Sequence, residues 1–300
     1  MESLDLVKEK IYEYVKEIGH QQSLDLLSQL SSGKMLRSKL IFKIAGVSQQ
    51  TVNICAIIEM IQSASLLHDD VIDEADTRRG QPSINALFDN KTSIMFGDVL
   101  YSKAFTQLTF LNKDIAYHIS NSVTLLSIGE MIDVSLADEF NTSFEKYLDM
   151  IYKKTASLIE ASSRVAAIIA NKDEDKFALY GRNLGIAFQM VDDILDITQT
   201  SEQLGKPAML DFVEGKVTIP YLLLFERLND NDKEYLKSLF KISLDLNQTN
   251  WIKEKMKTTN ALNDAILMAN KYAQDAIEAI KDENSDELIE IISAMVNRDY

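Results

Sequence analysis

The sequence predicts an all-α protein, and three observations carry that prediction. Only three prolines and ten glycines occur in 300 residues, so few positions interrupt regular structure. Apolar residues recur at helical intervals almost throughout the chain, as at Ile54, Ile57, Ile58 and Ile61. No segment shows the sustained alternation of apolar and polar residues that is typical of a half-buried strand. We therefore expect long helices packed around a substantial core.

Composition narrows the class of protein further. The formal net charge of −15 argues against a nucleic-acid partner, because the two would repel each other. The single cysteine, Cys55, lies in an apolar run, so it is interpreted as a core residue in a reduced compartment. The first residues are acidic where a secretory signal would be basic, and no apolar stretch reaches the ~20 residues of a membrane span. We expect one cytoplasmic domain over residues 1–300, with no integral membrane segment.

A first acidic cluster carries three aspartates, Asp69, Asp70 and Asp73, in a D-D-x-x-D pattern. Asp69 and Asp73 are four positions apart, so on a helix their carboxylates lie on one face. Like charges so placed repel unless a cation lies between them. Mg²⁺ prefers oxygen ligands of this kind and keeps several waters, which phosphate oxygens can replace. A single cluster of this type is equally well explained as an acidic surface or a helix cap.

The same pattern returns later in the chain at Asp192, Asp193 and Asp196, again within an apolar helical run. Two copies in two apolar helices favour a functional interpretation over a solvated acidic surface. If the two helices pack side by side, six carboxylates surround one cavity and three Mg²⁺ would balance their charge. A diphosphate would then be held by metal ions rather than by protein carboxylates.

Basic residues lie beside glycine or proline near both clusters. They are Arg78 and Arg79 before Gly80, Lys206 before Pro207, Lys216 after Gly215, and Lys34 and Arg37 after Gly33. Guanidinium groups bind phosphate oxygens in pairs and lysine acts as a point charge. In an acidic chain, bases grouped at such turns indicate a diphosphate site.

These motifs resemble those of trans-type polyprenyl diphosphate synthases. The matching segments are LLHDDVIDEADTRRGQPS (residues 66–83), GRNLGIAFQMVDDILD (181–196) and LGKPAMLDFVEGKVTIP (204–220), with shorter matches at 33–38, 96–105, 129–134 and 152–162. The resemblance implies an isoprenoid synthase-type bundle of long helices around a deep central cavity, forming a homodimer. It implies condensation of isopentenyl diphosphate with an allylic prenyl diphosphate, and three Mg²⁺ per active site with Mn²⁺ as a substitute.

The resemblance also implies roles for individual residues. Asp69, Asp73 and Asp192 would hold Mg²⁺, supported by Asp70, Asp193 and Asp196. The allylic diphosphate would contact Arg78, Lys154, Thr155, Gln189, Lys206 and Lys216, with Lys154 and Lys206 also counted as catalytic. Isopentenyl diphosphate would contact Gly33, Lys34, Arg37, Gln62 and Arg79.

The chain departs from the family pattern at several positions. Relatives often have Arg and Pro where this chain has Met35 and Ser38, and a small residue where it has Met209. The loss of one base from the isopentenyl diphosphate site could weaken binding there, although Lys34 and Arg37 remain. None of these changes removes an expected metal ligand.

The expected chemistry is electrostatic. Metal ions and bases stabilise the departing diphosphate, the allylic C–O bond ionises, and the isopentenyl double bond attacks the cation. No protein nucleophile is required, and His68 is interpreted as a packing residue rather than a base. Ala64 and Ser65, one turn before the first motif, have small side chains, which by themselves are typical of close helix packing. Relatives that stop at short products often carry a bulky aromatic residue in this region. The resemblance therefore implies a medium-to-long product of about C30 to C50, and we expect about C40, as used for quinone side chains.

Other interpretations remain open at this stage. A short-chain synthase making farnesyl or geranylgeranyl diphosphate would share every motif and differ only in where growth stops. A terpene cyclase would lack the second complete aspartate motif. A noncatalytic subunit of a heteromeric synthase would be expected to lose aspartates or bases, which this chain keeps. A purely structural helical protein would leave the acidic clusters unexplained.

Overall fold

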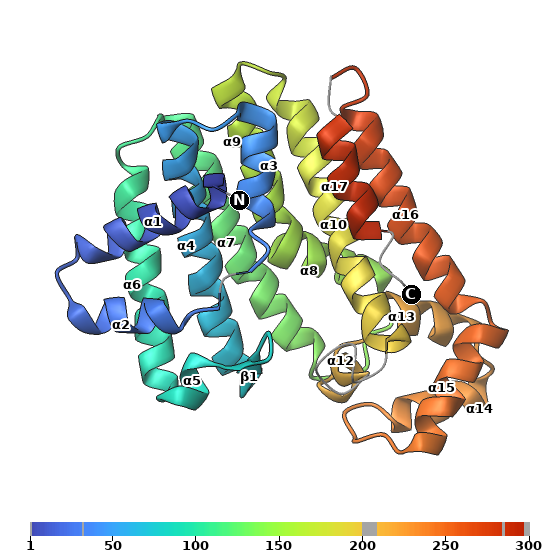
Figure 1. Cartoon of the computed structure of the whole chain (residues 1–300). Helices are drawn as coiled ribbons and strands as arrows, with labels where there is room; N and C mark the ends of the chain where they lie inside the picture. Colours follow the sequence, from blue (N-terminus) through green and yellow to red (C-terminus); the bar gives the residue numbers. More distant parts are fainter. Residues whose placement is uncertain (1, 32, 200–208, 284–285, 297–300) are drawn as a thin grey trace. The chain divides into compact units, whose positions relative to one another are not determined.

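The structure, a computed structural model, describes residues 2–31, 33–199, 209–283 and 286–296. The predicted all-α class is confirmed, because helices account for nearly all regular structure in these residues (Figure 1). The exceptions are two short strands, β1 (Thr77–Arg78) and β2 (Gln81–Pro82), which form one antiparallel hairpin.

The chain forms two compact units. Unit 1 comprises Met1–Thr124 and Glu160–Ala178, and unit 2 comprises Leu125–Ile159 and Leu179–Tyr300. The organisation of residues 1–300 as a single domain stays a prediction.

Unit 1 contains helices on both sides of the hairpin in the sequence. They are α1 (Glu2–Lys16), α2 (Gln21–Gln29), α3 (Leu36–Ala45), α4 (Gln49–Ile72), α5 (Ile84–Leu87) and α6 (Asn90–Leu108). Three further helices run from one unit into the other along the chain: α7 (Lys113–Leu136), α9 (Ser157–Ala170) and α10 (Glu174–Thr198).

Unit 2 contains the remaining helices. They are α8 (Phe144–Ile151), the π-helix η1 (Tyr152–Ala156), α12 (Leu210–Val213), α13 (Ile219–Arg227), α14 (Asp230–Ser238), α15 (Leu246–Thr258), α16 (Ala261–Ala279) and α17 (Asp286–Val296). A π-helix is rare and is frequently found at functional sites. Here it directly joins α8 to α9 and contains two of the predicted site residues.

Helix α4 forms the centre of unit 1. It packs against α6, α1 and α3, and Ile54, Ile58 and Ile61 have no exposed surface. A capping box begins the helix, since Ser48 and Thr51 each accept a hydrogen bond from the other's backbone N–H. By length and composition α4 could cross a membrane, contrary to the expectation that no stretch is long enough. However, 61% of its most apolar window is buried, as expected for a core helix.

The core of unit 2 is built on close helix contacts. Helix α16 places Ala261, Ala265 and Ala269 at four-residue intervals, all fully buried, and it packs against α13. Small side chains at this spacing let helix axes approach closely, because no bulky side chain separates them. The rings of Phe212 and Tyr221 stack with centroids 4.3 Å apart. This core supports α10, which carries the second aspartate motif.

Candidate active site

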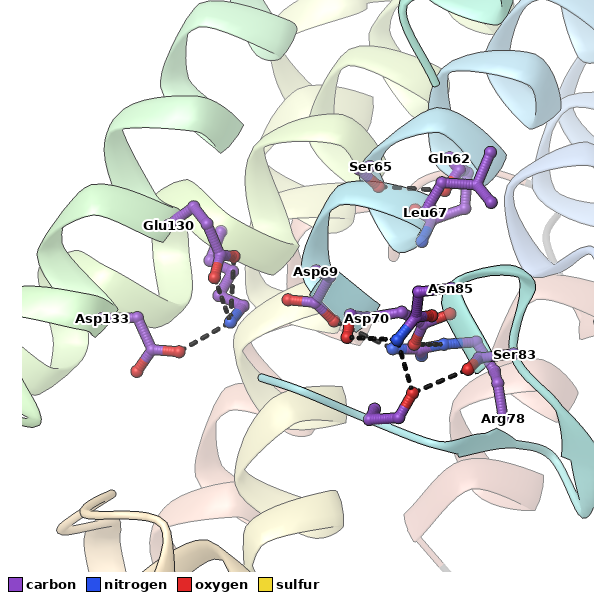
Figure 2. Close-up of polar contacts among 12 residues, drawn as sticks. Gln62, Ser65, Leu67, Asp69, Asp70, Arg78, Ser83, Asn85, Glu130 and Asp133 are labelled. Atoms are coloured by element: carbon purple, nitrogen blue, oxygen red, sulfur yellow. Dashed lines mark hydrogen bonds and ion pairs between the residues drawn. The ribbon is translucent and has the colours of Figure 1, made fainter. Parts of the chain in front are cut away.

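The first aspartate motif lies at the carboxyl end of α4, where Arg78 bridges two of its carboxylates (Figure 2). Arg78 donates from Nη2 to Asp69 Oδ2 at 3.1 Å and from Nε to Asp70 Oδ1. The Asp69 side chain keeps 18% of its surface exposed and that of Asp70 only 5%. Burial raises the pKa of Asp70, and the charge of Arg78 opposes that rise. The backbone N–H of Asp73 bonds to Asp69 O at 2.8 Å, so the helical spacing of the two carboxylates is confirmed.

The hairpin β1–β2 explains how Arg78 reaches the motif. Its turn residues, Arg79 and Gly80, have φ values of 55° and 72°, which is typical of a two-residue type I′ turn. The side-chain amide of Asn85 donates to the backbone oxygen of Asp70 at 3.3 Å, which ties the segment after the hairpin to the helix end (Figure 2). Arg78 is therefore held in place by the local fold as well as by its ion pairs.

Three of the residues expected at the isopentenyl diphosphate site come together in unit 1. Arg79 donates to the backbone oxygen of Ser31 at 2.9 Å. A Cβ at position 33 would lie 2.6 Å from Arg79 Nη2, so Gly33 leaves the space that this guanidinium occupies. Burial lowers the pKa of Arg37 to about 10; the charge of Glu59 opposes the change and that of Arg79 adds to it. The two guanidinium groups are thus close enough to interact, as a diphosphate site requires.

The other residues of this group are placed less specifically. Lys34 is exposed. Gln62 lies on α4, and its Oε1 is buried without a hydrogen-bond partner among the described residues. The departure at Ser38 has a structural role, because its hydroxyl donates to Glu59 Oε1 at 2.7 Å. Met35 has a left-handed conformation with φ of 48° immediately before α3, and its side chain is buried.

The expected chain-length residues lie one turn before Asp69. Ala64 is fully buried, and its backbone oxygen faces Gly97 of α6, where an added Cβ would come within 3.3 Å. Ser65 is partly exposed and donates to the backbone oxygen of Gln62 at 2.9 Å (Figure 2). His68 contacts α6: its Nε2 lies 3.1 Å from Ile94 O and 3.5 Å from Asp98 Oδ1, and its ring occupies the space left by Gly97. Its interpretation as a packing residue stays a prediction.

The second aspartate motif lies on α10 in unit 2 and is tied to two other elements. Asp193 Oδ2 accepts from the hydroxyl of Tyr147 on α8 at 2.6 Å, and Oδ1 accepts from Gln189 Nε2 at 2.9 Å. Gln189 Oε1 in turn accepts from Thr155 of η1 at 2.8 Å. Burial and, to a smaller extent, the charge of Asp211 raise the pKa of Asp193 to about 8, although the hydrogen bonds from Tyr147 and Gln189 oppose the rise. Burial and the charge of Asp193 together raise the pKa of Tyr147 well above its usual value.

Lys154 of η1 is held between two carboxylates of α7 (Figure 2). Its Nζ lies 2.9 Å from Glu130 Oε2 and 2.6 Å from Asp133 Oδ2. Gly129 makes this possible, because a Cβ there would lie 2.3 Å from the backbone nitrogen of Lys154. Gly185 likewise lets α10 approach η1 closely, because a Cβ there would lie 2.5 Å from Ala156 Cα. Two glycines thus bring both helices against the π-helix.

The remaining predicted bases follow the second motif. Lys206 lies outside the described residues. Lys216 is half-buried and pairs with Glu214 at 3.1 Å, while its backbone N–H bonds to Asp211 O at 2.7 Å. Asp196 is buried, and its Oδ2 accepts from the backbone N–H of Asp211 at 3.3 Å.

The aspartates divide into two groups by exposure. Asp69, Asp73 and Asp192 are all partly exposed, whereas Asp70, Asp193 and Asp196 are buried. The three accessible aspartates are the ones expected to hold metal ions, and that assignment stays a prediction. Within the part of the chain that the structure describes, no three His, Cys, Asp or Glu side chains gather into one metal-binding group. The donor set fits Mg²⁺ even so, because that ion keeps waters and phosphate oxygens in much of its coordination shell.

Sequence reasoning missed four residues of these networks. They are Glu59, Glu130, Asp133 and Tyr147. Glu130 and Asp133 fall within a segment, residues 129–134, that resembles the family, so that match was an available signal. Nothing in the sequence pairs Tyr147 with an aspartate 46 positions away.

The chain is similar in sequence to known proteins. A family model described as polyprenyl synthetase matches residues 20–258. Solanesyl-diphosphate synthase 1, mitochondrial, of Oryza sativa subsp. japonica is 46% identical over 178 residues, which are 58% of this chain and 41% of that protein. Short chain isoprenyl diphosphate synthase of Methanothermobacter thermautotrophicus is 32% identical over 78% of this chain and 77% of its own length.

Solved structures show the same likeness over nearly the whole chain. The octaprenyl pyrophosphate synthase of Helicobacter pylori aligns with a TM-score of 0.94 and 44% identity, covering 99% of both chains. A polyprenyl synthase of Caulobacter crescentus CB15, solved with calcium and isoprenyl diphosphate, aligns with a TM-score of 0.87 and 28% identity, covering 99% of this chain and 94% of that one.

Proposed function

Because this chain belongs to the polyprenyl synthetase family, we propose that it condenses isopentenyl diphosphate head to tail with an allylic prenyl diphosphate. We propose a medium-to-long all-trans product of about C40, a precursor of quinone side chains. The observation that carries this proposal is the likeness to an octaprenyl pyrophosphate synthase over the full length of both chains. The rice protein is named for another long-chain product, but the matched region is less than half of that protein.

The proposed metal ligands are the partly exposed aspartates Asp69, Asp73 and Asp192. Bound divalent cations, Mg²⁺ with Mn²⁺ as a substitute and three in number, would supply positive charge to the departing diphosphate. Support comes from the burial pattern of the two motifs and from the calcium and isoprenyl diphosphate found with the Caulobacter relative.

The chain's own bases would act on the diphosphate from fixed positions. Arg78 is held at the first motif and Lys154 at η1, each by two carboxylates. Preorganised charges of this kind stabilise a developing diphosphate anion without reorganising at the moment of reaction. Lys206 and Lys216 would add to this charge. Arg37 and Arg79, with Gly33, Lys34 and Gln62, would hold the isopentenyl diphosphate.

Product length is proposed to depend on Ala64 and Ser65. Neither side chain is large enough to block a growing chain below the first motif. Because Ala64 is fully buried where α4 meets α6, a bulky residue there would strain that helix contact at about 1–3 kcal/mol. Ser65 is partly exposed, so a substitution there changes the wall with less disturbance of the core.

We further propose a cytoplasmic homodimer organised as a single domain. Large apolar side chains that the monomer leaves exposed support a dimer, among them Met95 on α6 (58% exposed) and Met131 on α7 (72%). We propose four exposed residues as candidates for a deeper stop of the growing product: Phe105, Met131 and Val134 on their helices, and Phe110 in the turn after α6.

The test is a product assay on the purified chain with farnesyl diphosphate, labelled isopentenyl diphosphate and Mg²⁺, resolved by chain length. We expect a ladder ending near C40 that EDTA abolishes. Arrest at C20 or below would favour the short-chain alternative, which the archaeal relative's name supports for that protein. No product with any allylic primer would favour a noncatalytic subunit and refute the proposal.

The second test replaces Ser65 with Phe and uses Ser65→Ala as the matched control. We expect the Phe variant to release shorter products at a similar Tm, since the ring would occupy space that the growing chain uses. An unchanged product length in a folded Ser65→Phe variant would refute the proposed role of this position.

A further inference from the structure

Tyr147 is a buried tyrosine with one polar contact to the second aspartate motif. It lies on α8, has 1% of its surface exposed, and donates its hydroxyl hydrogen to Asp193 Oδ2 at 2.6 Å. Asp193 is itself only 3% exposed. The bond is short and both of its partners are buried, so neither can exchange it for a bond to water. The pair therefore fixes the position of Asp193 relative to α8.

The bond from Tyr147 is the first of three in a continuous chain. Asp193 Oδ1 accepts from Gln189, and Gln189 accepts from Thr155. The directions follow from the donors: the Tyr147 hydroxyl and the Gln189 NH₂ group donate to the two Asp193 oxygens, and the Thr155 hydroxyl donates to the Gln189 oxygen. Gln189 therefore turns its NH₂ group to Asp193 and its oxygen to Thr155. The chain links α8, α10 and η1, all within unit 2.

This arrangement limits what Asp193 can do. Both of its oxygens accept hydrogen bonds, one from buried Tyr147 and one from partly exposed Gln189, and turning the carboxyl group toward a metal ion would leave the Tyr147 hydroxyl without its acceptor. An unsatisfied buried donor is costly, so Asp193 stays fixed. Its neighbour Asp192 is partly exposed and lies on another side of α10, since successive helical residues are rotated by about 100°.

We propose that Tyr147 is a positioning residue for the second aspartate motif. Its hydroxyl fixes the position of Asp193. Asp193 in turn fixes the rotation of α10, which presents Asp192, and it fixes Gln189, which holds Thr155 in η1. The ligand whose binding depends on this is a diphosphate with its divalent cations. This inference rests on the proposed function, and it assigns to Tyr147 a role that acts through Asp193 without contact with substrate.

The matched pair of variants is Tyr147→Phe and Tyr180→Phe. Tyr180 is also fully buried in unit 2, and its hydroxyl donates to the backbone oxygen of Leu288 at 3.2 Å, away from the motif. Each substitution removes one buried hydroxyl and keeps the ring. Tyr180→Phe therefore controls for the loss of a buried hydroxyl, and weaker binding by Tyr147→Phe alone would report on the aspartate motif.

The measurement is calorimetric titration of each full-length protein with inorganic diphosphate and Mg²⁺, which needs no turnover. We expect Tyr147→Phe to bind roughly tenfold more weakly, as the loss of one buried hydrogen bond predicts. Tyr180→Phe should bind like the unsubstituted protein. In kinetics, Tyr147→Phe should need more Mg²⁺ for half-maximal rate, with little change in KM for isopentenyl diphosphate.

The outcomes separate this inference from the proposed function. If the unsubstituted protein binds diphosphate with Mg²⁺ and Tyr147→Phe binds it equally well, the positioning role is refuted alone. If the unsubstituted protein binds no diphosphate, the proposed function fails and the inference fails with it. Should Tyr147→Phe not fold, Asp193→Asn takes its place, because it leaves Gln189 without its carboxylate; unchanged binding by that variant also refutes the proposal.

Discussion

Replacing Gly129 with Ala tests whether the position of η1 controls activity. Gly129 lies on α7 directly beside the π-helix. An added Cβ would lie 2.3 Å from the backbone nitrogen of Lys154 and 2.7 Å from its Cα, whereas ordinary contacts begin at 3.4 Å. Backbone atoms cannot turn aside as a flexible side chain does. The two helices must therefore separate by about 1 Å at this point.

The size of the effect follows from that displacement. The Lys154 ammonium lies 2.6 Å from Asp133, so a shift of about 1 Å weakens the ion pair that positions it. Overpacking a tight contact lowers the free energy of unfolding by about 1–3 kcal/mol, and the greater helix propensity of Ala over Gly offsets up to about 1 kcal/mol of that loss. We expect a small fall in stability but a loss of roughly 10²-fold in kcat/KM, since misplacing a catalytic group by 1 Å can have that effect.

The assay combines thermal unfolding with steady-state kinetics for the allylic substrate. Ser127→Ala is the control, because Ser127 is exposed on the same helix and its substitution adds no atoms near η1. Wild-type kcat/KM in a folded Gly129→Ala variant would show that the close approach of α7 to η1 does not position Lys154 for the reaction.

Three further predictions concern the metal ligands, a departure from the family pattern and the cysteine. Asp69→Ala and Asp192→Ala should each lower turnover by orders of magnitude with little change in Tm, and near-normal turnover in either would contradict its metal role. Ser38→Ala should lower the free energy of unfolding in urea by about 1–3 kcal/mol, because Glu59 loses a buried donor; equal stability would mean that water replaces it. Cys55 should resist alkylation in the native protein and react in urea, because burial raises the pKa of its thiol; rapid native labelling would place it at the surface.

Helical periodicity is a local property, and it determined the fold class correctly from the sequence. The spacing within each aspartate motif is also local, so the predicted placement of Asp69 and Asp73 one turn apart is confirmed. The one local expectation that needed correction concerns α4. Its length and composition alone would allow a membrane span, and only its packing against α6, α1 and α3 shows it as a core helix.

Partners far apart along the chain could not be predicted in this way. Arg79 bonds to Ser31 across 48 positions, and Tyr147 bonds to Asp193 across 46. The sequence placed Gln189 and Thr155 among the residues that contact diphosphate, and the structure adds a direct bond between them. Which residues meet depends on how helices cross, and the crossing at η1 depends on two glycines whose importance is visible only beside their neighbours.

The sequence by itself determined the helical class, the family and the residue types available to bind metal ions and diphosphate, because these follow from composition and short-range spacing. Tertiary structure decided which carboxylates stay accessible and which are buried and bonded within the protein. Adjacent aspartates such as Asp192 and Asp193 are chemically identical in the sequence. They differ in the folded chain because Asp192 stays partly exposed, whereas Asp193 is buried and bonded to Tyr147 of α8 and to Gln189.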